Sequence, residues 1–275
     1  MAIVLFAATL HAGWNALVRV SSHKFQDTVL IVLGAAVWTA FLLPLAPMPA
    51  AESWPYLAAS VLIHAAYFTL VALSYRGGEL SFAYPLMRGS APAMSAVAVS
   101  LLLNESPSLG GWIGVLLISC GVAILAGDSW RAGTFRAAPA MFALANAAVI
   151  AVYTLIDGQG ARLSGHAFSY TGWMFLLTAP LLLAISAANQ GREILQRIQL
   201  GWGRGLIGGA CTLASYGLAL WAMTRAPIAL VAALRETSVV FAAIIAACFL
   251  KEPITPLRYA SIFTVTAGAV AIKVF

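Results

Sequence analysis

Two arginines lie in stretches that are apolar enough to sit in lipid. Arg88 is in AYPLMRGSAPAMSAVAVSLLLNES, and Arg235 is in ALRETSVVFAAIIAACF. An arginine near the centre of a bilayer costs at least about 2.5–3.5 kcal/mol, so it is normally retained for function or paired inside the protein. A guanidinium that faces a cavity can hold a carboxylate or phosphate through parallel hydrogen bonds. The alternatives are internal pairing, for Arg235 with Asp157, backbone carbonyls or Glu236 of another copy, or a side chain that reaches the membrane surface.

Other polar and aromatic side chains recur at helical spacing. His11 and Asn15 share one helical face, as do His64 and Tyr67, and Tyr153 shares a third with Asn146 and Asp157. Such a stripe on a membrane helix should face protein or water, so the choice is between a cavity and helix–helix hydrogen bonds. The predicted substrate-binding residues are His11, Trp14, Asn15, His64, Tyr67, Tyr84, Arg88, Tyr153, Tyr216 and Arg235.

The arginines, histidines and aromatic residues of this set carry further expectations. Glu236 follows Arg235 directly and is expected to neutralise it, which leaves Arg88 as the main substrate contact. Histidine titrates near neutral pH, so His11 or His64 is expected to make transport pH-dependent. Four aromatic residues have an alternative place in the belts at the membrane–water interfaces; they are Trp14, Tyr84, Trp173 and Trp221.

The composition indicates the elements that position these residues. The chain of 275 residues is 62% hydrophobic and only 9% charged, whereas soluble domains are about half apolar and about a quarter charged. Its apolar blocks have the roughly 20 residues that a helix needs to cross about 30 Å of hydrocarbon. We therefore predict an all-α membrane protein with ten transmembrane helices, at 2–20, 28–46, 54–75, 80–103, 108–127, 138–157, 167–187, 204–223, 228–250 and 256–274.

The distribution of lysine and arginine predicts the orientation. Ten of these residues lie at the odd-numbered connections and three at the even-numbered side. Because basic residues favour the cytoplasmic side, we expect the odd connections in the cytoplasm and both termini outside. The predicted location is the inner (plasma) membrane, as a multi-pass protein.

The chain contains an internal repeat. Residues 86–125 align with 233–272 at a shift of 147, which pairs Arg88 with Arg235 and Glu105 with Glu252; at a shift of 149, Tyr67 pairs with Tyr216. The prediction is two five-span repeats, residues 1–127 and 138–275, in a single membrane domain. An odd number of spans inserts the second repeat upside down, an arrangement typical of secondary transporters with a central substrate site.

The motifs of this repeat resemble those of a known family. A glutamate turn ends the fourth and ninth spans (LLLNES, CFLKEP), and glycine-containing spans follow (GGWIGVLLISCGVAIL, ASIFTVTAGAVAI). With LHAGWNALVR in the first span, they resemble the EamA-type repeat of the drug/metabolite transporter superfamily over essentially the whole chain. The resemblance implies a central cavity lined by spans 1–4 and 6–9, with spans 5 and 10 peripheral, and export of amino acids or other small metabolites, including aromatic amino acids. The two glutamates are expected to cap the next helix or to bind basic residues.

The sequence shows no motif of an enzyme or an ATP-driven pump. It has no phosphate-binding glycine loop with a lysine and no His-Glu-x-x-His motif. Cys120, Cys211 and Cys248 lack metal spacing and are predicted to be packing residues. We therefore predict no cofactor, metal site or catalytic residue, and no nucleic-acid partner. The expected partners are a small-molecule substrate and membrane lipids, in a monomer or homodimer.

The leading hypothesis is a secondary transporter or facilitator that exports small metabolites, most often amino acids, by alternating access. A phosphate-ester or nucleotide-sugar exchanger of the same superfamily stays open, because two arginines would suit a phosphate. A membrane-embedded enzyme acting on lipid head groups is the alternative of another class.

Overall fold

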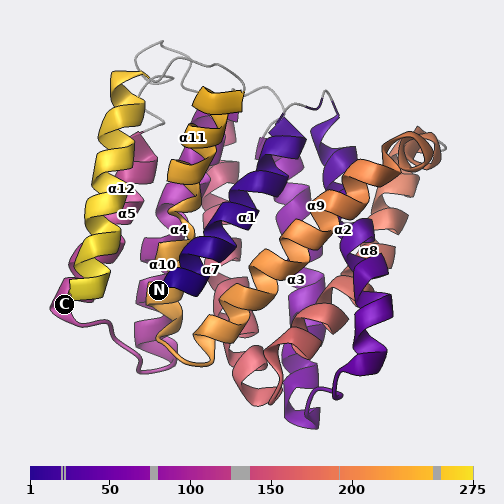
Figure 1. The fold of residues 1–275 in the computed structure, drawn as a ribbon, viewed down its shortest axis with the longest axis horizontal. Helices are drawn as coiled ribbons and strands as arrows, with labels where there is room; N and C mark the ends of the chain where they lie inside the picture. The colour runs from indigo at the N-terminus through magenta and orange to yellow at the C-terminus, as the bar shows by residue number, and fades with distance from the viewer. Residues whose placement is uncertain are drawn as a thin grey trace.

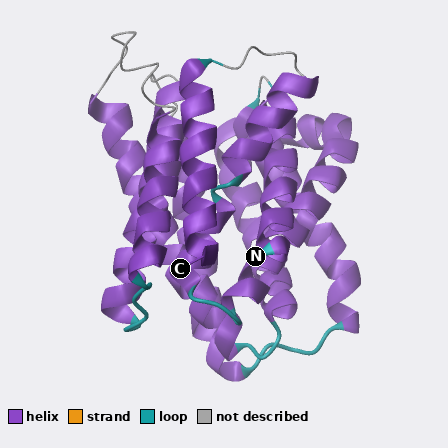
Figure 2. Cartoon of the chain, turned by 60° about the vertical axis from the view of Figure 1, so that its left-hand side comes forward, coloured by secondary structure: helices purple, strands orange, loops and turns teal. Residues whose placement is uncertain are grey.

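The protein is a bundle of helices. The computed structural model describes residues 1–19, 21, 23–74, 80–124, 137–191, 193–249 and 255–274 (Figure 1). Within these ranges every regular element is helical, and no strand occurs (Figure 2). The all-α fold class is therefore confirmed.

A helix lies at each of the ten predicted ranges. The first half contains α1 (Ala2–Arg19), α2 (Lys24–Leu42), α3 (Trp54–Ser74), α4 (Leu80–Leu102) and α5 (Leu109–Ile124), with the 3₁₀ helices η1 (Leu43–Leu45) and η2 (Ala51–Ser53) between α2 and α3. The second half contains α7 (Ala137–Leu163), α8 (Ala167–Gln190), α9 (Glu193–Met223), α10 (Ile228–Arg235), α11 (Ser238–Phe249) and α12 (Pro256–Val274).

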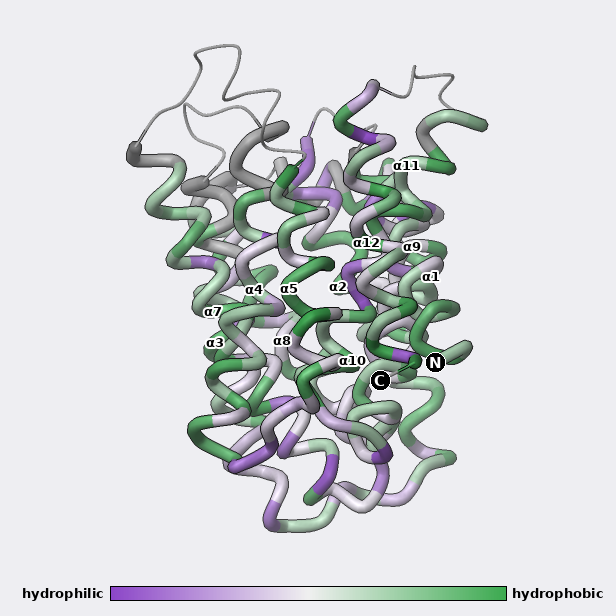
Figure 3. The backbone as a smooth tube through the Cα atoms, turned by 90° about the vertical axis from the view of Figure 1, so that its left-hand side faces the viewer, coloured by the Kyte–Doolittle hydropathy of each residue, from purple (hydrophilic) through white to green (hydrophobic). Residues whose placement is uncertain are grey.

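The surface and the interior are those of a membrane protein. Large apolar side chains such as Phe41, Leu101 and Phe263 are 73–76% exposed, whereas polar residues such as Asn146 and Asp157 are fully buried. Hydrophobic residues cover the lengths of the helices in Figure 3, and hydrophilic ones gather mostly near the ends. Six helical segments among the described residues are long and apolar enough to cross a membrane, and three further apolar helices are shorter. The count of ten crossings stays a prediction.

Helix α7 continues six residues beyond its predicted end at Asp157, so this carboxylate lies inside the helix. The two glycines that follow, Gly158 and Gly160, are packing positions. A Cβ on Gly158 would lie 2.6 Å from Cδ1 of Ile228, and one on Gly160 would lie 2.5 Å from Oη of Tyr170. Both glycines therefore allow close contact with other helices.

The predicted span 228–250 is not one continuous helix but two, although residues 228–245 remain a single segment long and apolar enough to cross a membrane. Helix α10 ends at Arg235, and α11 begins at Ser238. At the break, the backbone N–H groups of Glu236 and Thr237 donate to carbonyls three residues back, and the Thr237 hydroxyl donates to the Leu234 carbonyl at 2.7 Å. These tight local bonds replace the regular α-helical ladder. The break leaves Arg235 and Glu236 buried inside the bundle.

The two halves of the chain pack against each other over most of the bundle. Helices α1 and α2 contact α9, α3 and α4 contact α7, and α5 pairs with α12. Glycines allow α5 and α12 to pack closely, because a Cβ on Gly268 would lie 2.7 Å from the Gly114 carbonyl oxygen, and one on Gly121 would lie 2.9 Å from the Val265 nitrogen. Helix α9 begins at Glu193, eleven residues before its prediction.

Candidate functional site

A partly open cavity lies between the two halves of the chain. Thr28, in the second turn of α2, is on its wall, so the cavity extends from the middle of the bundle toward the α1–α2 connection. The lining side chains are His11, Trp14, Thr28, Ile31, Val32, His64, Tyr67, Arg88, Tyr153, Met174, Phe175, Thr178, Thr212, Ser215, Tyr216 and Arg235.

Eight of the ten predicted site residues are on this wall. Asn15 is not, and its side-chain nitrogen donates to the His11 carbonyl one turn back at 2.8 Å. The side chain of Tyr84 lies outside the described residues. Trp14 is a wall residue, in edge contact with the His11 ring at 5.1 Å between centroids.

Arg88 is neutralised by a carboxylate from the other half of the chain. Its Nη2 lies 2.9 Å from Oε1 of Glu236, and both side chains are about 5% exposed. The same nitrogen lies 3.2 Å from Nε2 of His11. Because a guanidinium only donates, this His11 nitrogen accepts the hydrogen bond.

The expectation that Glu236 would neutralise Arg235 was wrong. Consecutive residues on a helix point about 100° apart, so they do not face each other. The break after α10 places Glu236 against α4, where it meets Arg88. Arg235 is the arginine whose charge is left without a carboxylate among the described residues.

Arg235 is buried but has no ion-pair or hydrogen-bond partner in the described part of the chain. It is 8% exposed, and its buried Nε atom makes no hydrogen bond. Its guanidinium carbon lies 5.0 Å from the centroid of the Tyr216 ring, within range of a cation–π contact. A buried cation on a cavity wall without a counter-ion is suited to bind an anion.

Asp157 lies behind the cavity wall and is fully buried. The Tyr170 hydroxyl donates to its Oδ1 at 3.1 Å, and the Tyr216 hydroxyl donates to its Oδ2. Nε2 of His64 lies 4.0 Å from the same Oδ2. Sequence analysis placed Asp157 on the stripe of Tyr153 but did not find this cluster.

Two further cavity-facing stripes, one of α9 and one of α8, were not predicted from the sequence. Thr212, Ser215 and Tyr216 follow each other at steps of three and one, and Phe175 and Thr178 lie three residues apart. The first spacing was a usable signal for a cavity-facing stripe, because Thr212, Ser215 and Tyr216 fall on one helical face. Asn146 is not on the cavity wall. Its amide donates to the Met87 sulfur at 2.7 Å, which joins α7 to α4.

The cavity wall predicts a pattern of chemical accessibility. With Cys120, Cys211 and Cys248 replaced by serine, we expect single cysteines at Thr178 and Thr212 to react with a small water-soluble thiol reagent, because both face the cavity. Labelling is read by mass spectrometry. The three native cysteines have to be replaced because Cys120 and Cys248 are exposed on the outer surface, which corrects their prediction as buried packing residues.

A cysteine at Asn146, fully buried between helices, is the matched control and should stay unlabelled. Equal labelling at all three positions would contradict this boundary of the cavity.

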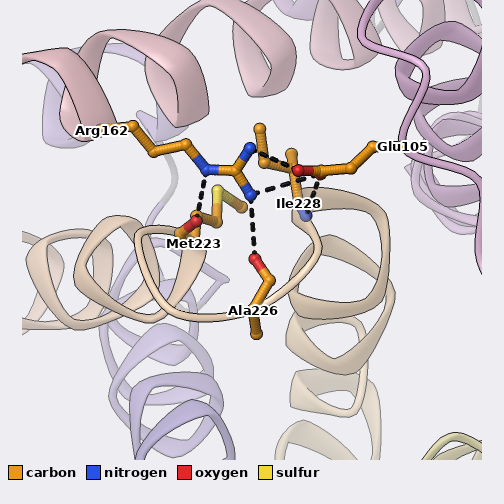
Figure 4. Close-up of polar contacts among 5 residues, drawn as sticks. All are labelled: Glu105, Arg162, Met223, Ala226 and Ile228. Atoms are coloured by element: carbon orange, nitrogen blue, oxygen red, sulfur yellow. Dashed lines mark hydrogen bonds and ion pairs between the residues drawn. The ribbon is translucent and has the colours of Figure 1, made fainter.

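A second polar cluster lies where the ends of α7 and α9 meet the start of α10 (Figure 4). Arg162, near the end of α7, binds both oxygens of Glu105 at 2.6 and 3.2 Å. Arg162 also donates to the carbonyls of Met223 and Ala226, at the end of α9, and Glu105 accepts from the N–H of Ile228, which begins α10. Glu105 therefore binds a basic residue as predicted, but it caps α10 instead of the next helix. Its repeat mate Glu252 lies outside the described residues.

We expect Arg162→Lys to destabilise the protein by about 1–3 kcal/mol, because lysine keeps the charge but loses the planar set of hydrogen bonds. Adding Glu105→Gln should cost little more, since the two side chains act as one unit. Thermal unfolding in detergent measures both effects.

Arg225→Lys is the matched control, because Arg225 is exposed and its guanidinium lies over the Trp221 ring, away from Glu105. Two fully additive losses at Arg162 and Glu105 would show that they do not act together.

An apolar helical bundle with a cavity between its two halves, lined by apolar and aromatic side chains and two arginines, is an arrangement that secondary transporters use. Residues 138–274 match the EamA-like transporter family. The chain therefore belongs to this family, and it is a multi-pass membrane transporter of the drug/metabolite transporter superfamily. No curated protein matches the chain. A solved structure described as "Crystal structure of protein" aligns with 100% of this chain and 99% of its own, with a TM-score of 0.70 and 19% identity. At that identity the likeness shows the fold alone.

Proposed function

We propose that this transporter moves zwitterionic amino acids across the inner membrane by alternating access, in the outward direction. The observation that carries the proposal is Arg235, a buried cation on the cavity wall that has no counter-ion among the described residues. A substrate carboxylate would supply the missing partner through two parallel hydrogen bonds.

The rest of the wall favours a small, partly apolar molecule. Tyr67, Tyr153 and Tyr216 contribute aromatic faces, and Thr178 contributes a hydroxyl that is buried and has no hydrogen-bond partner in the described part of the chain. Aromatic surfaces bind apolar side chains and also attract an ammonium group through its charge. An amino acid combines these groups with the carboxylate that Arg235 requires.

The charges of the cavity disfavour a phosphate ester or a nucleotide sugar. A phosphate monoester carries close to two negative charges. Glu236 neutralises Arg88, so the described cavity offers one uncompensated arginine, which balances a single carboxylate. An enzyme acting on lipid head groups is also disfavoured, because the buried carboxylates Asp157 and Glu236 are both engaged by other side chains.

The helix contacts support two inverted five-helix repeats, residues 1–127 and 138–275. If the halves are exchanged, α1 against α9 becomes α7 against α3, and α4 against α7 becomes α10 and α11 against α1; contacts of all these kinds occur. The α5–α12 pair maps onto itself. We propose that the cavity is accessible from the cytoplasmic, odd-numbered side in this conformation and that rocking of the repeats exposes it to the other side.

Flux measurements test the function. We expect the purified protein in liposomes to exchange labelled for unlabelled amino acid in a panel of L-phenylalanine, L-leucine and L-threonine, and not to exchange glucose 6-phosphate. Exchange of the sugar phosphate alone would overturn the amino acid assignment. Absence of exchange of every compound by a folded, correctly inserted protein would overturn the proposal as a whole.

A further inference from the structure

A second pocket lies apart from the central cavity, between the end of α7, the first turn of α8 and the end of α9. The two share no lining residue among those described. The wall of the second pocket consists of Ala161, Arg162, Gly165, His166, Ala167, Phe168, Trp221, Thr224 and Arg225. Arg162 and Arg225 are two of the three basic residues at the even-numbered side. The pocket therefore lies near the membrane surface on that side of the bundle.

The pocket carries a positive charge that no described residue neutralises. Arg225 is exposed, and its guanidinium carbon lies 4.7 Å from the centroid of the Trp221 ring. No carboxylate pairs with Arg225 in the described part of the chain, and the wall of the pocket holds no aspartate or glutamate. Arg162 is on the same wall, but the carboxylate of Glu105 compensates its charge at 2.6 Å. The pocket is therefore suited to an anion with a single negative charge.

N–H donors supplement this charge at the start of α8. Nδ1 of His166 accepts the backbone N–H of Ser169 at 3.2 Å, so the hydrogen of the neutral ring is on Nε2. Nε2 has no acceptor among the described residues. The first two backbone N–H groups of α8, those of Ala167 and Phe168, also have no acceptor within the helix, and the positive end of the helix dipole lies there. With Arg225 beside them, these donors fit the oxygens of a phosphate.

The aromatic residues of the pocket favour a lipid over a soluble anion. Phe168 is in the first turn of the membrane-crossing segment Ala167–Ala188 and is 44% exposed. Its ring lies against α9, because a Cβ on Gly217 would be 2.9 Å from Cδ1 of Phe168. Tryptophan is enriched at membrane–water interfaces, which is the alternative place that the sequence offers for Trp221. Basic pockets between membrane helices bind phospholipid head groups, and an exposed phenylalanine can contact the acyl chains.

We propose that this pocket binds an anionic phospholipid through its phosphodiester group. Arg225, Nε2 of His166 and the start of α8 hold the phosphate, and Trp221 and Phe168 lie beside the glycerol and the acyl chains. Phosphatidylglycerol has the required chemistry, because its single negative charge balances Arg225. Phosphatidylcholine has the same phosphate, but its choline cation cancels the charge that Arg225 attracts. The site is separate from the substrate cavity and does not depend on the proposed amino acid transport.

Native mass spectrometry of the purified protein in detergent tests this site. Phosphatidylglycerol and phosphatidylcholine with the same acyl chains are titrated separately, and the affinity for the first bound lipid is measured. We expect the unmodified protein to bind phosphatidylglycerol about fivefold more tightly, which is the effect of one basic residue at a membrane surface. Bound phosphatidylglycerol should also raise the unfolding temperature, because it binds the folded state.

In Arg225→Gln, we expect the preference for phosphatidylglycerol to disappear. Arg225→Lys keeps the charge without the planar fork, so it should retain part of the preference. Lys273→Gln is the matched control and should retain all of it, since Lys273 is an exposed basic residue near the end of α12, on the same even-numbered side but outside the pocket. Thermal unfolding without added lipid verifies that each variant is folded.

A soluble head group separates a lipid site from a site for a free phosphodiester. We expect glycerophosphoglycerol, which is phosphatidylglycerol without its acyl chains, to bind far more weakly than the lipid. Binding as tight as that of the lipid would overturn the lipid assignment. Equal affinity of the unmodified protein for the two lipids, or a preference that survives in Arg225→Gln, would overturn the site itself. Loss of the preference in Lys273→Gln as well would also overturn it, because it would indicate a general effect of surface charge.

Discussion

Arg235→Gln is expected to weaken substrate binding by about 10- to 150-fold, the loss of a charge-assisted interaction worth about 1.5–3 kcal/mol. Glutamine removes both the charge and the planar fork that would hold a carboxylate. Arg235→Lys keeps the charge and should retain part of the affinity. Equilibrium binding of labelled L-phenylalanine, L-leucine and L-threonine to the purified protein measures the change.

The stability of these variants should change little. Arg235 has no ion-pair partner in the described part of the chain, so its removal leaves no buried carboxylate without a counter-ion. Arg204→Gln, an exposed substitution within the membrane-crossing part of α9 (Ile198–Met223), is the matched control and should bind normally. Unchanged affinity in Arg235→Gln would show that the carboxylate is held elsewhere.

Much of the fold could be predicted because each helix that crosses a membrane needs a long, continuous apolar segment. A block of about 20 apolar residues is long enough to be recognised even when its boundaries are uncertain. The stripes of His11, His64, Tyr67 and Tyr153 were also visible, since helical spacing alone places their polar and aromatic groups on one face. Their assembly on one cavity wall agrees with that interpretation.

The break between α10 and α11 could not be predicted in the same way. Residues 235–238 contain neither proline nor glycine, the usual signals for the end of a helix. The Thr237 hydroxyl, bonded to the Leu234 carbonyl, belongs to a residue type that is common inside membrane helices. Helix α7 is instead longer than predicted, and Gly158 and Gly160, in its added residues, serve packing.

Which arginine lacks a carboxylate partner depends on contacts that sequence spacing does not encode. Glu236 is one residue from Arg235 along the chain, but its carboxylate lies 2.9 Å from Arg88, which is 148 positions away. The rotation between neighbouring residues of a helix and the break that follows decide this pairing. We therefore propose an exchange of expected roles, in which Arg88 stabilises the fold through Glu236 and Arg235 is the substrate contact.

This exchange of roles predicts a large effect on stability at Arg88. Arg88→Gln should destabilise the protein by about 3–5 kcal/mol, because it leaves the Glu236 carboxylate buried and uncompensated. The double variant Arg88→Gln/Glu236→Gln replaces the ion pair by two neutral amides that can bond to each other, so it should recover most of the loss. Thermal unfolding in detergent, followed by size-exclusion chromatography, measures both. Arg225→Gln, on the exposed surface, should cost no more than about 1 kcal/mol.

Substrate binding by the double variant then shows whether Arg88 contacts the substrate or only stabilises the fold. Because Arg235 is intact, the double variant should still bind the labelled amino acids, with an affinity far closer to that of the unmodified protein than to that of Arg235→Gln. If Arg88→Gln alone is as stable as the unmodified protein, the buried pair contributes nothing to the fold. If the stable double variant loses binding as completely as Arg235→Gln, Arg88 contacts the substrate, and the carboxylate lies between the two arginines.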